Sequence, residues 1–245
     1  MKKIHSFTRK ILADDVDMFR SMRYSVFLRW LQEASIAHTE ALGAGRDKTL
    51  DKGALWVIAR VSVEILRMPQ YDEVVTFRTW AGKTRHVLFP RYYEIIDAEG
   101  NVAVRASAVW LLMDAKTRKM AFPDKYGVRI ADTSTGTELP LPAGVPTQDA
   151  PPVYRHTVRF QDVDINGHMN NSKYIDVVED ALGFDFLHDF ELTRFEIDYE
   201  EEIRGGKRVS LFGKCDDGKI YFEGRTGNKV CFRVGAEYTH RAVLY

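Results

Sequence analysis

The feature that most constrains this chain is an internal repeat. The segment DDVDMFRSMRYSVFLRWLQEA near the start aligns, residue for residue, with QDVDINGHMNNSKYIDVVEDA in the second half. Asp15 falls on Asp162, and Asp17 falls on Asp164. Both segments place apolar residues at i, i+3, i+4 and i+7, which is the buried stripe of an amphipathic helix. The chain therefore contains one structural plan twice.

Each helical pattern is followed by segments typical of β-strands. Gly43 and Gly183 mark the ends of the two helical patterns. β-Branched and aromatic residues then dominate short runs, which are separated by turn sequences such as DAEGN, DDGK and RTGN. A sheet with one apolar face needs a cover, and each half supplies one helix. The predicted strands are Ala54–Leu66, Val74–Trp80, Val87–Asp97, Val102–Asp114, Phe195–Ile203, Val209–Cys215, Ile220–Gly224 and Val230–Thr239.

A segment of different composition joins the two halves. Residues 133–152 are rich in Pro, Gly, Thr and Ser, and we interpret them as a linker. The length of 245 residues accommodates two small domains. The sequence thus predicts an α+β protein of two paired units, residues 1–132 and residues 153–245.

Composition narrows the classes of function. Lys plus Arg and Asp plus Glu each total 35, so no global charge favours nucleic acid or a membrane surface. No run reaches the roughly 18 apolar residues of a membrane span. The basic N-terminal segment lacks the apolar core of a signal peptide. Cys215 and Cys231 form neither a disulfide framework nor a metal-ligand spacing, so we expect a cytoplasmic protein with reduced cysteines.

The two copies differ in residues that can carry chemistry. In the second copy, polar residues alternate with apolar or small ones from position 162 to 170. Asn166 falls on Phe19, and His168 falls on Ser21. A segment that only capped a helix would carry cap-type residues in both copies. The difference favours a functional site in the second half.

A second difference lies in the strand that follows each helix. Matching Val63–Ile65 to Ile197–Tyr199 places Met68 opposite Glu202. The second copy thus has a carboxylate where the first has a thioether. This second difference also favours a functional site in the second half.

The pattern D-x-D-x-N-x-H-x-N-N-x-K-Y, from Asp162 to Tyr174, resembles the signature of acyl-acyl-carrier-protein thioesterases. These are the plant plastid enzymes and their bacterial relatives. The similarity extends from about Ile11 to Val234. In the first half it is carried by the run from Trp80, at Arg105, Ala106, Ser107, Trp110, Thr117, Arg118 and Lys119.

This resemblance implies a tandem hot-dog fold, in which two antiparallel sheets each wrap round a central helix. It implies hydrolysis of fatty acyl-carrier-protein thioesters in fatty acid biosynthesis. The family's active residues, carried over position by position, are Asp164, Asn166, His168 and Glu202. The family commonly has cysteine after the glutamate, but isoleucine stands here and cannot be a nucleophile. Plant members also carry a transit peptide that we do not recognise here, and we expect a bacterial, cytoplasmic relative.

The roles expected within this set follow from thioester chemistry. Glu202 is expected to activate a water molecule, while His168 and Asn166 orient the water or bind the carbonyl oxygen. Asp164 is expected to orient a neighbouring donor, either Asn166 or the start of the helix. The chemistry needs no metal and no organic cofactor.

The start of the second helix offers a place for the thioester carbonyl. Backbone N–H groups near Asn170, Asn171 and Lys173 are free of partners within a helix and lie at its positive end. Both asparagines are also ordinary helix-capping residues. Asp162 is shared with Asp15 of the first copy, and we interpret it as structural.

Further residues are expected to bind the acyl chain and the carrier protein. The resemblance places the acyl tunnel largely in the first half, although each candidate for its lining is also an ordinary core residue. An acidic carrier protein requires a basic docking surface. The candidates for that surface are Lys173, Arg204, Lys207 and Arg208, with Arg194 close in sequence. The candidates for the tunnel are Trp30, Leu31, Ala34, Trp56, Ile58, Val109 and Leu111.

Two alternatives stay open at this point. The same fold and residues serve a thioesterase that acts on coenzyme A esters. A non-catalytic acyl-binding protein would keep the scaffold without turnover. Hot-dog hydratases place His and Asp differently, and neither half shows such a motif. A monomer and a homodimer are both compatible with a tandem repeat.

Overall fold

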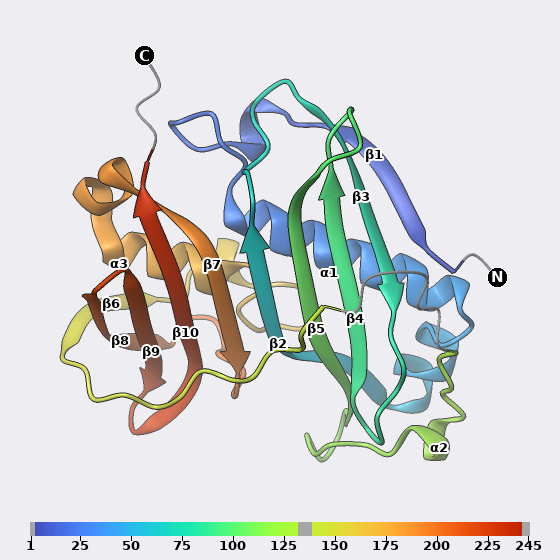
Figure 1. Ribbon diagram of the computed structural model, residues 1–245. Helices are drawn as coiled ribbons and strands as arrows, with labels where there is room; N and C mark the ends of the chain where they lie inside the picture. The colour runs from blue at the N-terminus through green and yellow to red at the C-terminus, as the bar shows by residue number, and fades with distance from the viewer. Residues whose placement is uncertain (1–2, 132–138, 242–245) are drawn as a thin grey trace. The chain divides into compact units, whose positions relative to one another are not determined.

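The computed structural model describes residues 3–131 and 139–241 (Figure 1). The chain divides into two compact units, Met1–Arg23 with Arg29–Pro142 and Tyr24–Leu28 with Ala143–Tyr245. Each unit holds one antiparallel sheet. Residues 133–138 of the predicted linker lie outside the described residues.

The sheet of the first unit has the strand order β1-β3-β4-β5-β2, and all neighbouring strands are antiparallel. The four strands predicted in this half are confirmed, with ends shifted by no more than two residues. The additional strand β1 was not predicted, because its sequence HSFTRK is mostly exposed and has little apolar character. The bounds are β1 His5–Lys10, β2 Ala54–Ile65, β3 Val74–Ala81, β4 Phe89–Ile96 and β5 Val102–Asp114, with a short α2 at Pro123–Tyr126.

Helix α1 (Tyr24–Ala41) crosses one face of this sheet (Figure 1). Its predicted apolar stripe is buried, and Trp30 makes edge contacts with the rings of Phe7 and Phe77. The helix ends as predicted at Gly43, whose φ of 73° is readily adopted only by glycine. The N–H of Gly43 and of the next residue donate to carbonyls of the last turn, which closes the helix.

The sheet of the second unit has the strand order β7-β10-β9-β8-β6, again antiparallel throughout. The strand predicted over 195–203 was wrong at both ends, because β7 begins directly after the helix and leaves the sheet before Glu200. The edge strand β6 was missed, and it begins at Pro152, inside the predicted linker. Proline is tolerated at the first residue of an edge strand. The bounds are β6 Pro152–Thr157, β7 Phe190–Tyr199, β8 Arg208–Asp216, β9 Lys219–Thr226 and β10 Lys229–His240.

Helix α3 (Lys173–Asp189) covers the second sheet and is interrupted at Gly183. The glycine has a φ of 79° and a ψ of 170°, so the helix breaks there and then resumes. The predicted end at Gly183 is therefore a break instead of a terminus. Before the break, the ring of Tyr174 lies 4.9 Å from that of Phe232 and 5.2 Å from that of Tyr199, which fixes the start of α3 against the sheet.

The packing of Phe232 gives a test of this core. A Cβ atom at Gly224 would lie 1.9 Å from Phe232, whereas one at Gly235 would meet only Val145 methyl groups at 3.5 and 3.6 Å. We expect Gly224→Ala to lower the free energy of unfolding by about 1–3 kcal/mol through overpacking. Urea denaturation measures the change, with Gly235→Ala as the matched control. Equal stability of the two variants would contradict this packing.

Candidate active site

The second unit has a tight turn within residues 162–170, the stretch in which polar residues alternate with apolar or small ones. Val163 and Met169 pair as neighbouring antiparallel residues on its two sides. The Asp164 N–H donates to the His168 carbonyl at 3.0 Å, and the Gly167 N–H donates to the Asp164 carbonyl at 3.0 Å. Gly167 has a φ of 78°, a conformation that suits glycine. The turn thus holds residues 164–168 in one defined conformation.

The Asp164 carboxylate shapes this turn from within. Its Oδ1 accepts the Asn166 N–H at 2.8 Å, which is the local bond that aspartate forms in turns. Asp164 was expected to orient Asn166 or the start of the helix, and the bond observed is to the backbone N–H of Asn166. The Asn166 residue itself is exposed to solvent at the tip of the turn.

The residues His168 and Glu202 meet although they are far apart in the sequence. The Met169 N–H donates to the Ile203 carbonyl at 2.7 Å, and His168 pairs with Arg204. This register brings His168 Nε2 to 3.5 Å from Glu202 Oε2. The His168 side chain is 19% exposed and the Glu202 side chain 38% exposed, so solvent water reaches both.

The first unit builds the same turn. The Asp17 N–H donates to the Ser21 carbonyl at 2.9 Å, and Asp17 Oδ1 accepts the Phe19 N–H at 2.9 Å. The Met22 N–H donates to the Pro69 carbonyl at 2.8 Å. Each of these three bonds has a counterpart in the second unit. The counterparts join Asp164 to His168, Asn166 to Asp164, and Met169 to Ile203.

The hydrogen bonds also settle the alignment of the strands. Since Pro69 takes the place of Ile203, Met68 takes the place of Glu202. The predicted match of Met68 with Glu202 is therefore confirmed. In the first unit, Gln70 Nε2 donates to Ser21 Oγ at 3.0 Å, so an uncharged amide and a hydroxyl meet there. A histidine and a carboxylate come together at this turn only in the second unit's copy.

Residues at the start of α3 are held by several backbone contacts. Asn170 Oδ1 accepts both the N–H and the hydroxyl of Ser172, at 2.9 and 2.8 Å. The Tyr199 hydroxyl donates to the Asn171 carbonyl at 3.0 Å. The N-cap position of α3 is Ser172, and the Asn170 side chain instead closes a local turn just before the helix.

Asp162 has the structural position expected of it. Its Oδ2 accepts the Arg159 N–H at 2.7 Å and lies 2.9 Å from His156 Nε2. In the first unit, Asp15 Oδ2 accepts the Leu12 N–H in the same way, at 3.0 Å. Both carboxylates therefore close the short helical turn that precedes the site.

Ile203 and three of the predicted docking residues follow Glu202 closely in the chain. Ile203 is 2% exposed, and its side chain belongs to the core. Arg204, Lys207 and Arg208 are exposed. Lys173 Nζ lies 2.9 Å from an Asp176 carboxylate oxygen, one turn along α3.

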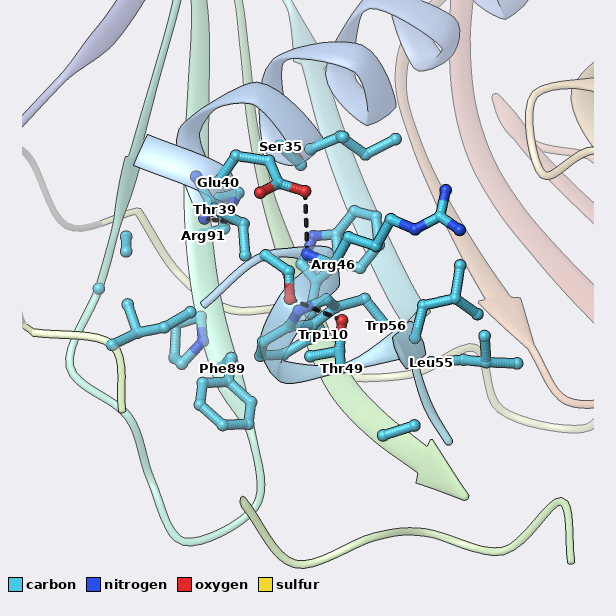
Figure 2. A pocket seen from close by; sticks show the side chains of 18 residues that line it. Ser35, Thr39, Glu40, Arg46, Thr49, Leu55, Trp56, Phe89, Arg91 and Trp110 are labelled. Carbon is cyan, nitrogen blue, oxygen red and sulfur yellow. Dashed lines mark hydrogen bonds between the residues drawn. The ribbon is translucent and has the colours of Figure 1, made fainter. Parts of the chain in front are cut away.

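A cavity of about 260 Å³ lies within the first unit (Figure 2). Of the residues predicted to hold the acyl chain, Trp56 lines it. Trp30, Leu31 and Val109 are buried but lie elsewhere in the core. Most of the wall is apolar, and Leu55, Trp56, Phe89, Trp110 and Ile130 are among the apolar side chains that line it.

Arg91 is a lining residue that sequence reasoning missed. It is 4% exposed and donates to His38 Nδ1 at 2.8 Å and to Thr39 Oγ1 at 3.0 Å. Burial lowers the pKa of its guanidinium. The available signal was a cation inside the largely apolar run LFPRYYEII, which also contains Glu94.

Two classes of site are not found in the described part of the chain. Residues 3–131 and 139–241 contain no group of three or more His, Cys, Asp or Glu side chains placed to hold a metal ion. None of the helices described here has the length and the apolar character to cross a bilayer.

Two units of this kind, each with one long helix and one antiparallel sheet, define a tandem hot-dog protein with a polar turn specialised in its second repeat. The model of the acyl-ACP thioesterase N-terminal domain matches residues 2–126, and that of the C-terminal domain matches residues 147–233. The chain belongs to the acyl-ACP thioesterase family.

Individual relatives agree with this assignment. The chloroplastic acyl-[acyl-carrier-protein] hydrolase FATB2 of Cuphea viscosissima is 27% identical over 208 residues, which cover 78% of this chain and 50% of that protein. The dodecanoyl-[acyl-carrier-protein] hydrolase of Cinnamomum camphora is 24% identical, over 80% of this chain and 55% of its own length. The chain thus spans about half the length of these curated relatives.

The fold is shared with a solved structure of similar size. An acyl-ACP thioesterase from Bacteroides thetaiotaomicron superposes with a TM-score of 0.87 at 24% identity, over 97% of this chain and 98% of that one. This likeness supports the tandem hot-dog fold of both units.

Proposed function

We propose that this chain hydrolyses fatty acyl-carrier-protein thioesters to a free fatty acid and the carrier thiol. The observation that carries the proposal is the pair of His168 and Glu202, 3.5 Å apart on a turn whose first-unit copy lacks both residues. Membership of the acyl-ACP thioesterase family supports this choice of substrate. The free cysteines Cys215 and Cys231 fit action in the cytoplasm.

In the proposed mechanism, Glu202 is the general base. Its carboxylate takes a proton from water, and the resulting hydroxide attacks the thioester carbonyl carbon. The tetrahedral intermediate then expels the thiolate, which receives the proton from Glu202. Ile203 stands where the family commonly has cysteine, so water is the nucleophile and no acyl-enzyme forms there.

The other members of the set position the reactants. His168 lies beside Glu202 and orients the attacking water. Asn166, at the tip of the turn, stabilises the negative oxygen of the intermediate. The backbone N–H groups of Asn170, Ser172 and Lys173, near the start of α3, already donate to Asp162 and Asn170. Asp164 acts indirectly, because its carboxylate fixes the backbone that carries Asn166.

We further propose that the two units divide the work. Residues 1–132 hold the acyl chain and residues 153–245 supply the catalytic groups. The mainly apolar cavity in the first unit and the confinement of the His–Glu pair to the second support this division.

The deciding experiment is single-turnover release of fatty acid. A panel of acyl-carrier-protein thioesters is tested beside the matching coenzyme A esters and beside the Glu202→Gln variant. Release from the carrier panel at the higher rate supports the proposal. Faster release from coenzyme A esters keeps the chemistry and changes the partner. Tight binding without release identifies an acyl-binding protein.

The exposed basic residues after Glu202 predict a dependence on the carrier. We expect Arg204→Glu with Lys207→Glu to lower kcat/KM on carrier-bound substrate about tenfold at low salt, through lost attraction to an acidic partner. Turnover of an acyl-pantetheine substrate, which has no protein partner, should not change. The matched control is Lys214→Glu with Lys219→Glu, on exposed positions of β8 and β9. An equal loss of kcat/KM in both double variants would contradict a docking surface at Arg204 and Lys207.

A further inference from the structure

Arg91 places a cation in the wall of a mainly apolar cavity. The side chain comes from β4 and reaches the last turn of α1, where Figure 2 shows it beside Thr39. Trp56, Phe89 and Trp110 supply much of the remaining wall. A hydrocarbon chain fits this wall everywhere except at the guanidinium.

The charge of Arg91 is not matched by a carboxylate. Its hydrogen bonds end on His38 Nδ1 and Thr39 Oγ1, which are uncharged acceptors. Since a guanidinium only donates, His38 Nδ1 accepts, and the imidazole is neutral with its proton on Nε2. No carboxylate of residues 3–131 or 139–241 forms an ion pair with Arg91. The last turn of α1 offers only a partial negative charge.

The other charged residues of the cavity have partners of their own. Glu40 Oε1 accepts the Arg46 N–H at 2.9 Å, and Arg46 Nε lies 3.1 Å from Asp51 Oδ1. Both Glu40 and Arg46 are exposed, in contrast to Arg91. The buried positive charge is therefore the distinctive polar feature of this wall.

We propose that the cavity selects acyl chains whose far end carries an oxygen acceptor, a carboxylate or a hydroxyl group, and that Arg91 recognises it. This inference rests on the proposed function, in which the first unit holds the acyl chain. A methyl-ended chain leaves the guanidinium facing hydrocarbon. A terminal carboxylate forms charge-assisted hydrogen bonds with it and neutralises the buried cation.

The test uses three S-alkyl pantetheine thioethers of equal chain length, which end in a methyl, a hydroxyl or a carboxylate group. Thioethers are not hydrolysed, so binding is measured without turnover. Titration calorimetry and the fluorescence of Trp56 and Trp110 report occupancy. With the full chain, we expect the carboxylate probe to bind about tenfold more tightly than the methyl probe, with the hydroxyl probe between them.

Variants assign this preference to one residue. Arg91→Met should abolish the preference and leave the methyl probe bound as well as before. Arg91→Lys should retain part of it. Arg46→Met, at the other arginine of the wall, should leave it unchanged. If near-ultraviolet circular dichroism shows that Arg91→Met does not fold, the affinities of the three probes for the wild type and for Arg91→Lys test the role of Arg91.

Two results would overturn the inference. One is tightest binding of the methyl probe by the wild type, and the other is an equal loss for all three probes in a folded Arg91→Met variant. The outcome is separable from that of the proposed function. If the carboxylate probe binds most tightly but no thioester is hydrolysed, only the proposed hydrolysis is contradicted. If thioesters are hydrolysed but the methyl probe binds most tightly, only the role of Arg91 is contradicted.

Discussion

We expect Glu202→Gln to lower the single-turnover rate on acyl-carrier-protein substrate about a thousandfold, within the range lost with a general base. The amide keeps the size of the side chain but cannot take a proton from water. Binding of a non-hydrolysable analogue should stay unchanged, because the substitution removes proton transfer and not contact area. The measurement is rapid-quench release of labelled fatty acid, with substrate affinity determined separately.

The neighbouring glutamate provides the control. Glu201 is exposed, and its Oε1 lies 2.7 Å from Lys229 Nζ. Glu201→Gln changes the charge by the same amount one residue away, and we expect nearly full activity. If Glu202→Gln retained the activity of Glu201→Gln, the base would have to be another group.

His168→Ser should lower the same rate about a hundredfold. Serine is the residue that the first unit carries at this position, Ser21, on the same backbone turn. We therefore expect the variant to fold, which circular dichroism and thermal unfolding check. The loss arises because Glu202 no longer has an imidazole 3.5 Å away to orient the water.

Combining the two substitutions tests whether the residues act together. If they form one unit, the double variant should be barely slower than Glu202→Gln alone, because coupled residues give non-additive losses. The control combines Glu202→Gln with His188→Ser, which replaces an exposed histidine in α3. Fully multiplicative losses would show that His168 and Glu202 act in separate steps.

Much of this architecture was predictable because the chain states it twice. The repeat predicted two helices and most strands, and it matched Met68 with Glu202 before any contact was known. The proximity of His168 to Glu202 depends on pairing between segments far apart in the sequence. The bond from the Met169 N–H to the Ile203 carbonyl and the pairing of His168 with Arg204 define it. The family signature contains His168 and the wider resemblance supplied Glu202, while the sequence periodicity alone could not bring them together.

Other features escaped sequence reasoning for identifiable physical causes. Strands β1 and β6 lie at sheet edges, where exposure removes the apolar alternation that marks a strand. Arg91 lies in an apolar strand, and its burial depends on His38 and Thr39 of a helix some fifty positions away. Asp164 was counted with the chemistry, although Asp17 in the first copy already held the same place in the turn.

The duplicated turn also bears on how such a protein diverges. The same backbone bonds form in the first unit, where Phe19 and Ser21 take the places of Asn166 and His168. The turn therefore tolerates different side chains at these positions. One copy of the turn can thus carry the proposed reactive groups while the other copy carries different side chains on the same backbone. The relation is in principle reversible. Phe19→Asn, Ser21→His and Met68→Glu would place the proposed reactive residues on the first copy, whose turn has the same backbone bonds.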